Sequence, residues 1–175
     1  MPRSRHATFV LTCTGLACVL LTVAACSGGS NTLDGKEVEQ SIGKQLRKDF
    51  AGASIGATKC PKEIKKKSGK EFTCTGTVGK EQVPITVTQT DRGPGYRAVR
   101  QVAVLDVAKV QTFVQTQYDQ TVGVQVTAAC APGKTVLAAK PQTKIPCTVT
   151  DAVGTSDTVQ VLVNDTSGNI SISVI

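Results

Sequence analysis

Hydrophobic residues recur at helical spacing in two segments of the chain. Between positions 36 and 50, apolar side chains stand at every fourth residue: Val38, Ile42, Leu46 and Phe50. Such residues share one stripe of a helix, so the spacing predicts an amphipathic helix whose core face is this stripe. A second stripe comprises Val107, Val110, Val114 and Tyr118. Asp34 and Asp106 precede the two segments, and aspartate at this place favours the start of a helix.

Most of the remaining chain alternates Val, Ile or Thr with polar residues, and Gly, Pro, Asn and Asp separate the alternating runs. This pattern predicts β-strands. In the first part of the chain we expect strands at 54–60, 71–78, 82–90 and 96–104. In the second part we expect them at 122–130, 144–150, 157–163 and 169–174.

The order of these features repeats along the chain. A helix leads to a cysteine near a proline, then to a second cysteine flanked by threonine, then to an alternating strand. The repetition predicts an α+β fold with two tandem repeats, residues 34–104 and 105–175. Each repeat would pack one amphipathic helix on a roughly four-stranded antiparallel sheet.

Four cysteines lie within the two repeats, and four cysteines allow three connectivities. A pair internal to each duplicated unit survives duplication unchanged, which selects Cys60–Cys74 and Cys130–Cys147. A core of about 70 residues is marginal, and closing a loop of roughly 15 residues contributes about 3 kcal/mol. A metal site is the alternative, but the chain has no Cys-x-x-Cys and its one histidine is His6. We therefore expect no metal and no cofactor.

The N-terminal 25 residues have the order of a secretory signal peptide, with basic residues, an apolar run and small residues before Cys26. The stretch from 20 to 27 resembles the lipobox of bacterial lipoproteins, which implies that Cys26 is lipidated and becomes the mature N-terminus. An uncleaved transmembrane helix and an ordinary cleaved signal are the alternatives; the run is short and interrupted for a bilayer span. Residues 26–33 would be the lipidated cysteine and a flexible tether. The expected location is the extracytoplasmic face of the bacterial cell membrane.

Positive charge is concentrated in the first repeat. Residues 34–104 contain 14 Lys and Arg against 8 Asp and Glu, a net charge of +6, whereas residues 105–175 contain 4 against 5, a net −1. Five lysines crowd the loop between the first two cysteines: Lys62, Lys65, Lys66, Lys67 and Lys70. Such a loop could contact anionic lipid or wall polymer beside the membrane. The alternative is a solvated loop that keeps the protein soluble. No aromatic residues interleave with the lysines, so nucleic-acid binding is not expected.

Residues for catalysis are scarce. Beyond position 25 the chain has no His, and nucleophilic catalysis by Ser or Cys usually needs an adjacent base. Ser41 and Lys44 match the Ser-x-x-Lys pattern of penicillin-recognising enzymes, but the companion motifs of that class are incomplete. Asp91 and Asp165 are the remaining candidates for carboxylate chemistry, and their position in turns favours a local contact with the backbone instead.

Several motifs together resemble a small domain of unknown function found in actinobacterial envelope lipoproteins. They are the lipobox, a Val-Glu-x-x-Ile helix at 38–42, Cys60-Pro61 and the Phe-x-Cys at 72–74. The second half resembles a diverged copy of the same domain. The resemblance implies an α+β fold with one disulfide per copy, and it implies no catalytic residues.

The leading hypothesis is therefore a non-enzymatic lipoprotein of the cell envelope that acts as a binding or interaction module. Its expected partners are the membrane through the lipid anchor, anionic lipid or wall polymer, and an unidentified envelope protein. A second hypothesis, prompted by a weaker likeness to tandem-repeat secreted inhibitors of β-lactamases, is an inhibitor or decoy that uses its sheet faces. Because fold does not imply function, this likeness carries little weight. The third and weakest hypothesis is an enzyme with carboxylate chemistry.

Overall fold

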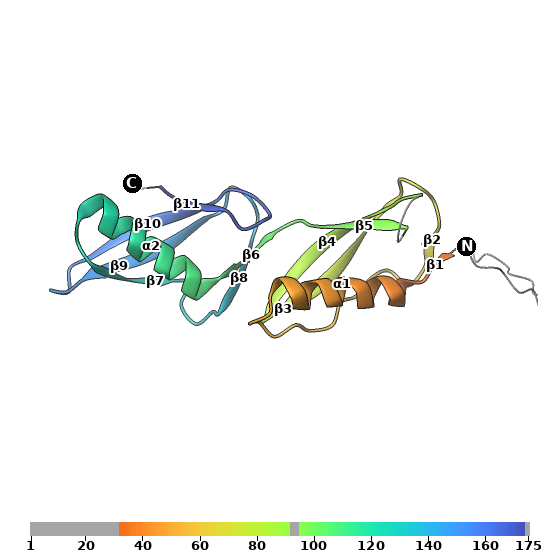
Figure 1. Ribbon diagram of the computed structural model, residues 1–175, viewed down its shortest axis with the longest axis horizontal. Helices are drawn as coiled ribbons and strands as arrows, with labels where there is room; N and C mark the ends of the chain where they lie inside the picture. The colour runs from red at the N-terminus through yellow and green to blue at the C-terminus, as the bar shows by residue number, and fades with distance from the viewer. Residues whose placement is uncertain (1–31, 92–94, 174–175) are drawn as a thin grey trace, which may run out of the picture.

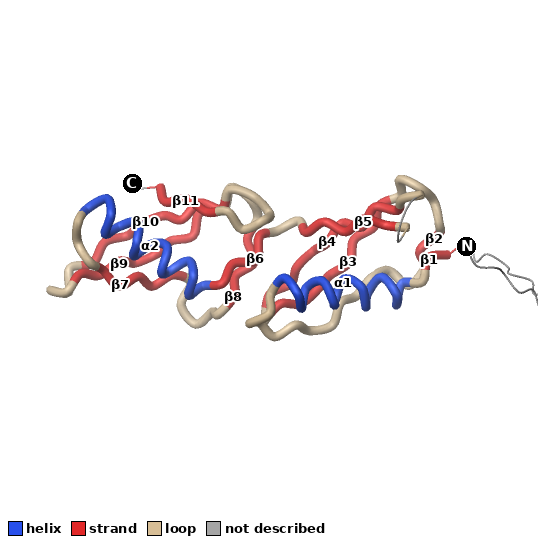
Figure 2. The backbone as a smooth tube through the Cα atoms, in the orientation of Figure 1, coloured by secondary structure: helices blue, strands red, loops and turns tan. Residues whose placement is uncertain are grey.

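The computed structural model describes residues 32–91 and 95–173 of the chain. The described residues form an elongated molecule in which the first and second halves of the chain lie one after the other along the long axis (Figure 1). Each half carries one helix on one face of an antiparallel sheet (Figure 2). The predicted α+β fold class is confirmed.

The first helix, α1 (Gly35–Asp49), begins where the sequence predicts. Asp34 is its N-cap, and its side chain accepts a hydrogen bond from the Lys36 N–H at 2.8 Å. The predicted stripe is buried at Val38, Ile42 and Leu46. Phe50 lies one residue beyond the helix and is partly buried, because the helix ends at Asp49.

The first sheet has the order β3–β4–β5, formed by β3 (Glu71–Val78), β4 (Glu81–Gln89) and β5 (Tyr96–Arg100). The prediction of a continuous strand at 54–60 is wrong, because this segment makes only two isolated bridges to β3, Ile55 to Val78 and Lys59 to Thr75. Between the two bridges the segment advances by four residues, whereas β3 advances by three. The segment therefore contains one extra residue, which forms a β-bulge. Gly56 lies in the bulge, where a Cβ would come within 3.0 Å of Thr77.

The strand predicted at 96–104 is divided into two strands. β5 ends at Arg100, and β6 (Ala103–Asp106) leaves the first sheet to pair with β8 (Val136–Ala139), a strand that the sequence analysis did not predict. A similar pair precedes α1, where β1 (Thr32–Leu33) pairs with β2 (Ile64–Lys65). The segment expected to be tether thus contributes Thr32 and Leu33 to a β-ribbon.

The second half contains α2 (Val107–Val122) and a sheet of order β11–β10–β9–β7. Its strands are β7 (Val126–Cys130), β9 (Lys144–Asp151), β10 (Ser156–Val163) and β11 (Ile170–Ser173). Asp106 caps α2 by accepting hydrogen bonds from the N–H groups of Ala108 and Lys109. The prediction of strand at residues 122–125 is wrong, because α2 extends to Val122 and ends on Gly123, whose φ is +74°.

Corresponding residues of the two halves make corresponding contacts. In each half the segment with the first cysteine lies at one sheet edge, and the strand with the second cysteine pairs with it. The structure contains the disulfides Cys60–Cys74 and Cys130–Cys147, as predicted. The turns before β3 and β9 also agree, since Gly69 and Gln142 both have positive φ, +73° and +68°, and both donate a backbone hydrogen bond to the end of the neighbouring strand.

Two apolar cores result, and the β6–β8 ribbon lies between them. Val104, Val136 and Ala138 pack with the core of the first half, together with Val102 before the ribbon. Ala103, Leu105, Leu137 and Ala139 pack with the core of the second half. Successive strand residues point to opposite faces, so the apolar residues at 103–105 and 136–139 join both cores. The ion pair between Lys134 and Glu81, at 2.7 Å, borders this junction.

Candidate surface-contact site at the N-terminal end

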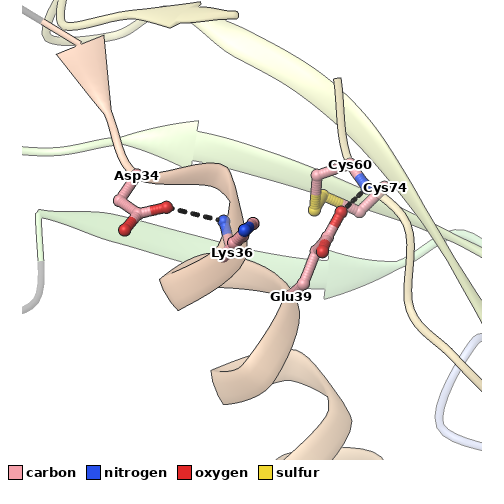
Figure 3. The surroundings of a disulfide bond; sticks show 5 residues. All are labelled: Asp34, Lys36, Glu39, Cys60 and Cys74. Atoms are coloured by element: carbon pink, nitrogen blue, oxygen red, sulfur yellow. Dashed lines mark hydrogen bonds between the residues drawn. A yellow bond between two sulfur atoms is a disulfide. The ribbon is translucent and has the colours of Figure 1, made fainter. Parts of the chain in front are cut away.

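The segment between Cys60 and Cys74 holds the five candidate lysines, and its start is attached to α1. The disulfide fixes Cys60 to β3, and the Cys60 N–H donates a hydrogen bond of 2.8 Å to the Glu39 carboxylate (Figure 3). Glu39 projects from the helix toward the disulfide, so the helix and the sheet hold the segment from two sides.

The middle of the segment is attached through the β1–β2 ribbon. Leu33 pairs with Ile64, which is buried at 4% exposure within the first half. Gly35 makes this approach close, because a Cβ at that position would come within 3.2 Å of the Pro61 carbonyl oxygen. The ribbon lies at the end of the molecule where the described chain begins (Figure 1).

The end of the segment is attached to β4 by Gln89, the one buried polar residue among the described residues. The side chain of Gln89 donates to the Lys65 carbonyl at 3.0 Å and accepts from the Lys67 N–H at 2.9 Å. Its backbone accepts from the Gly69 N–H and donates to the Lys70 carbonyl, each at 2.9 Å. These four hydrogen bonds give residues 65–70 a defined path.

We call Lys62, Lys65, Lys66, Lys67 and Lys70 the lysine platform. All five are exposed, and in the described part of the chain none of them makes an ion pair. Glu63 and Glu71 are the acidic residues within the same stretch, so it carries a net charge of +3. Lysines without ion-pair partners on a backbone of defined path can attract an anionic surface. Because the backbone is already ordered, binding costs little further conformational entropy.

Sequence reasoning missed Glu39 and Gln89, the two residues that position the platform. Gln89 carried a signal, since it continues the inward alternation of Val83, Ile85 and Val87 and is polar where a core residue is expected. A polar residue at such a position must find hydrogen-bond partners. Glu39 carried no comparable signal, because a glutamate beside a helix stripe normally faces water.

The other candidate residues lie outside the segment between Cys60 and Cys74. Cys26 lies outside the described residues. Asp165, in the turn after β10, accepts hydrogen bonds from the backbone N–H groups of Ser167, Gly168 and Asn169, so the predicted local role is confirmed for it. The hydrogen bond from the Asn169 side chain, followed by those from the backbone, lowers the pKa of Asp165. Asp91 is exposed in the turn after β4.

Two further observations concern metals and membranes. Among residues 32–91 and 95–173, His, Cys, Asp and Glu form no group of three or more that could hold a metal ion. Within the same ranges, neither helix has the length and apolar character needed to cross a bilayer.

Each half has a groove between its helix and its last strand. The groove between α1 and β5 measures ≈ 500 Å³ and is lined partly by charged side chains, among them Asp49, Arg97 and Arg100. The groove between α2 and β11 measures ≈ 790 Å³, and its lining includes Phe113, Tyr118, Ile170 and Ile172.

The geometry defines a disulfide-bonded α+β protein with two helices, several antiparallel sheets and a basic surface at one end. In comparison with known families, a model described as a domain of unknown function (DUF4333) matches residues 17–93. The matched stretch includes α1, β3, β4 and the lysine platform, and it agrees with the expected domain of unknown function. No curated protein and no solved structure matches the chain significantly.

Proposed function

We propose that this protein is a lipid-anchored, non-catalytic protein of the bacterial envelope whose first half rests on an anionic membrane through the lysine platform. The observation that carries the proposal is the position of the platform. Five exposed lysines lie at the end of an elongated molecule where the described chain begins, next to β1.

The short tether supports this assignment. Six residues, from Ser27 to Thr32, can span at most about 20 Å when fully extended. If Cys26 carries the lipid, β1 and the platform are kept near the headgroups, where each basic residue contributes about 1 kcal/mol. The resulting orientation places the platform against the membrane and the second half away from it.

We also propose that the two halves are diverged copies of one domain, as the resemblance to actinobacterial lipoproteins implies. The matching disulfides, helix caps and turns support a duplication. In this view the first copy kept an exposed basic end, and the second copy replaced the equivalent end with the apolar β6–β8 ribbon.

Membrane binding can be tested on the chain from residue 27 onward, which lacks the proposed lipid site. We expect it to bind vesicles containing phosphatidylglycerol at low salt, to dissociate as salt rises, and to ignore phosphatidylcholine vesicles. Changing Lys65, Lys66 and Lys67 to Gln should weaken binding more than about tenfold, given about 1 kcal/mol per charge. A matched control changes three exposed lysines of the second half, Lys109, Lys140 and Lys144, to Gln and should leave binding within about twofold.

Two results would contradict the proposal. If both triple variants lose binding equally, the effect reflects net charge and not the platform. If the protein binds a wall polyanion but no anionic vesicle, the platform contacts the cell wall instead. The anchor is tested separately by Cys26→Ser, which should release the protein from the membrane or leave an unprocessed precursor.

A further inference from the structure

Exposed apolar side chains gather at the end of the molecule that lies opposite the lysine platform. Among the described residues, four large hydrophobic side chains are exposed: Val99, Val122, Val124 and Val153. Val122 ends α2, Val124 follows it, and Val153 lies in the turn between β9 and β10, all at the far end of the second half (Figure 1). We call these three residues the distal valines.

The corresponding place in the first half is covered. Counting from the N-cap aspartates, Phe50 corresponds to Val122, since each lies 16 residues after its cap. The strand pairing gives a second correspondence. Ile55 pairs with Val78 and Val126 pairs with Asp151, so Ile55 corresponds to Val126. Ala53 and Val124, two residues earlier in each half, therefore correspond to each other. Phe50 and Ala53 belong to the first core and share a groove with Val104 and Val136 of the β6–β8 ribbon.

The junction between the halves therefore shows what such an end can bind. It receives a two-stranded ribbon whose facing side chains, Val104, Val136 and Ala138, are apolar. Beside the ribbon, Lys134 pairs with Glu81 of the receiving half. The receiving end thus combines apolar side chains with a carboxylate, and the incoming ribbon brings the cation.

The distal end has the same combination of features. Val122 and Val124 line a hollow of ≈ 130 Å³ together with Asp151 and Asp157. The lysines of the second half lie toward its other end: Lys109 in the first turn of α2, Lys134 at the junction, Lys140 after β8 and Lys144 at the start of β9. An apolar surface bordered by carboxylates is complementary to an apolar segment bordered by cations.

From this correspondence we propose that the distal valines form a docking surface for another envelope protein, which contributes an apolar two-stranded β-ribbon flanked by Lys or Arg. A second copy of this chain is not the expected occupant. Its exposed ribbon is β1–β2, which presents Lys65 where β6–β8 presents Ala138, and in an anchored copy that ribbon lies at the membrane. The surface thus serves a different protein at the end away from the lipid.

A defined probe can be built from the ribbon that fills the equivalent place. Asp106 lies opposite Val136 and Ala103 opposite Ala139, so an Asn-Gly turn can join 102–106 to 136–140 in a hairpin of matched strands. A second Asn-Gly turn closes the ring, because an isolated hairpin is marginally stable. With the full chain in detergent solution, we expect the labelled cyclic hairpin to bind and to shift the NMR signals of Val124 and Val153.

Matched variants make the test specific. The double change Val122→Asp and Val124→Asp should reduce hairpin affinity by about tenfold or more, which corresponds to about 1.4 kcal/mol. Val99→Asp, at a site of similar exposure in the first half (45% against 41% for Val124), should leave affinity within about twofold. The circular dichroism of both variants should match that of the parent protein.

Other outcomes would overturn the proposal. They are no binding at the highest soluble hairpin concentration, equal losses in the two variants, or concentration-dependent self-association that the double variant abolishes, which would make a second copy the occupant. Vesicle binding by the lysine platform is measured independently, so failure of one proposal is distinguishable from failure of the other.

In cells, a photo-crosslinker at position 124 should yield a partner peptide of alternating apolar residues with a neighbouring Lys or Arg. A peptide without that pattern would contradict the assignment.

Discussion

The β1–β2 and β6–β8 ribbons occupy the same place in the two halves and have opposite surroundings. In each ribbon the first strand directly precedes a helix capped by aspartate. The second strand of each ribbon lies in the segment between two disulfide-bonded cysteines. Thr32 and Lys65 of the first ribbon are exposed, whereas the corresponding Val104 and Ala138 pack against the core of the first half. The same backbone arrangement therefore serves as a charged outer surface in one half and as an apolar junction in the other.

The difference shows how a few side chains change the role of an element. A ribbon with apolar residues on both faces must be covered on both faces, whereas a ribbon with one polar face can end a molecule. Burying a lysine without a partner is costly, so Lys65 prevents another protein unit from covering the first ribbon as the first half covers the second.

Exchanging residues between the ribbons should have the largest effect. Ala138→Lys places an ammonium group and a long side chain at a partly buried position of the junction, and we expect it to destabilise the protein by about 3 kcal/mol. The reciprocal change, Lys65→Ala, removes an exposed side chain and should alter stability by less than about 0.5 kcal/mol. Urea unfolding of both variants measures the difference. Equal effects would show that the two ribbons do not differ in burial.

Removing the Gln89 side-chain amide should loosen the lysine platform. Gln89→Val loses the contacts to the Lys65 carbonyl and the Lys67 N–H and leaves both groups short of a partner, at a cost of about 2 kcal/mol. Hydrogen exchange at the Lys67 amide should become faster. Gln82→Val, at an exposed position on the same strand, is the control and should change neither quantity. Unchanged exchange at Lys67 would mean that packing, and not Gln89, orders the platform.

The turn that precedes β3 in the first half and β9 in the second half offers a stabilising change. Gln142 has a φ of +68° where the first half has Gly69. A non-glycine residue is destabilised by roughly 1 kcal/mol in this left-handed region of backbone conformation. Gln142→Gly should therefore raise the free energy of unfolding by up to about 1 kcal/mol. Gly69→Gln should lower it by a similar amount. If both changes destabilise, Gln142 makes a contact that outweighs its backbone strain.

The smallest expected effect concerns pH. Because the folded-state pKa of Asp165 is lowered, this carboxylate stabilises the fold above its ordinary pKa of 3.8, and the contribution is lost as pH falls through the folded value. Asp165→Asn should flatten the pH dependence of stability in this acid range and should lower stability slightly at neutral pH, where the wild-type carboxylate is charged. Asn169→Ala, which removes the largest cause, should move the Asp165 titration measured by NMR upward. A titration that stays in place would show that the backbone donors suffice.

The sequence by itself determined the local elements and the disulfide pattern. Helical periodicity located α1 and most of α2, aspartate caps located their starts, and two-residue alternation located β3, β4, β9 and β10 within one or two residues. Such features depend on neighbours along the chain, so they are readable from it. The basic excess of the first half and its concentration near Cys60 were readable for the same reason.

Only the tertiary structure decided how the segments between the cysteines are used. Val136–Ala139 is short and lies in a loop region, and it becomes a strand because β6, distant in sequence, provides its hydrogen-bond partners. Likewise, the division of 96–104 into β5 and β6 depends on pairing with two different strands. Gln89, a single buried amide, orders residues 65–70 from 22 to 24 positions away. Long-range pairing and burial made these assignments, and neither is encoded in the period of a local pattern.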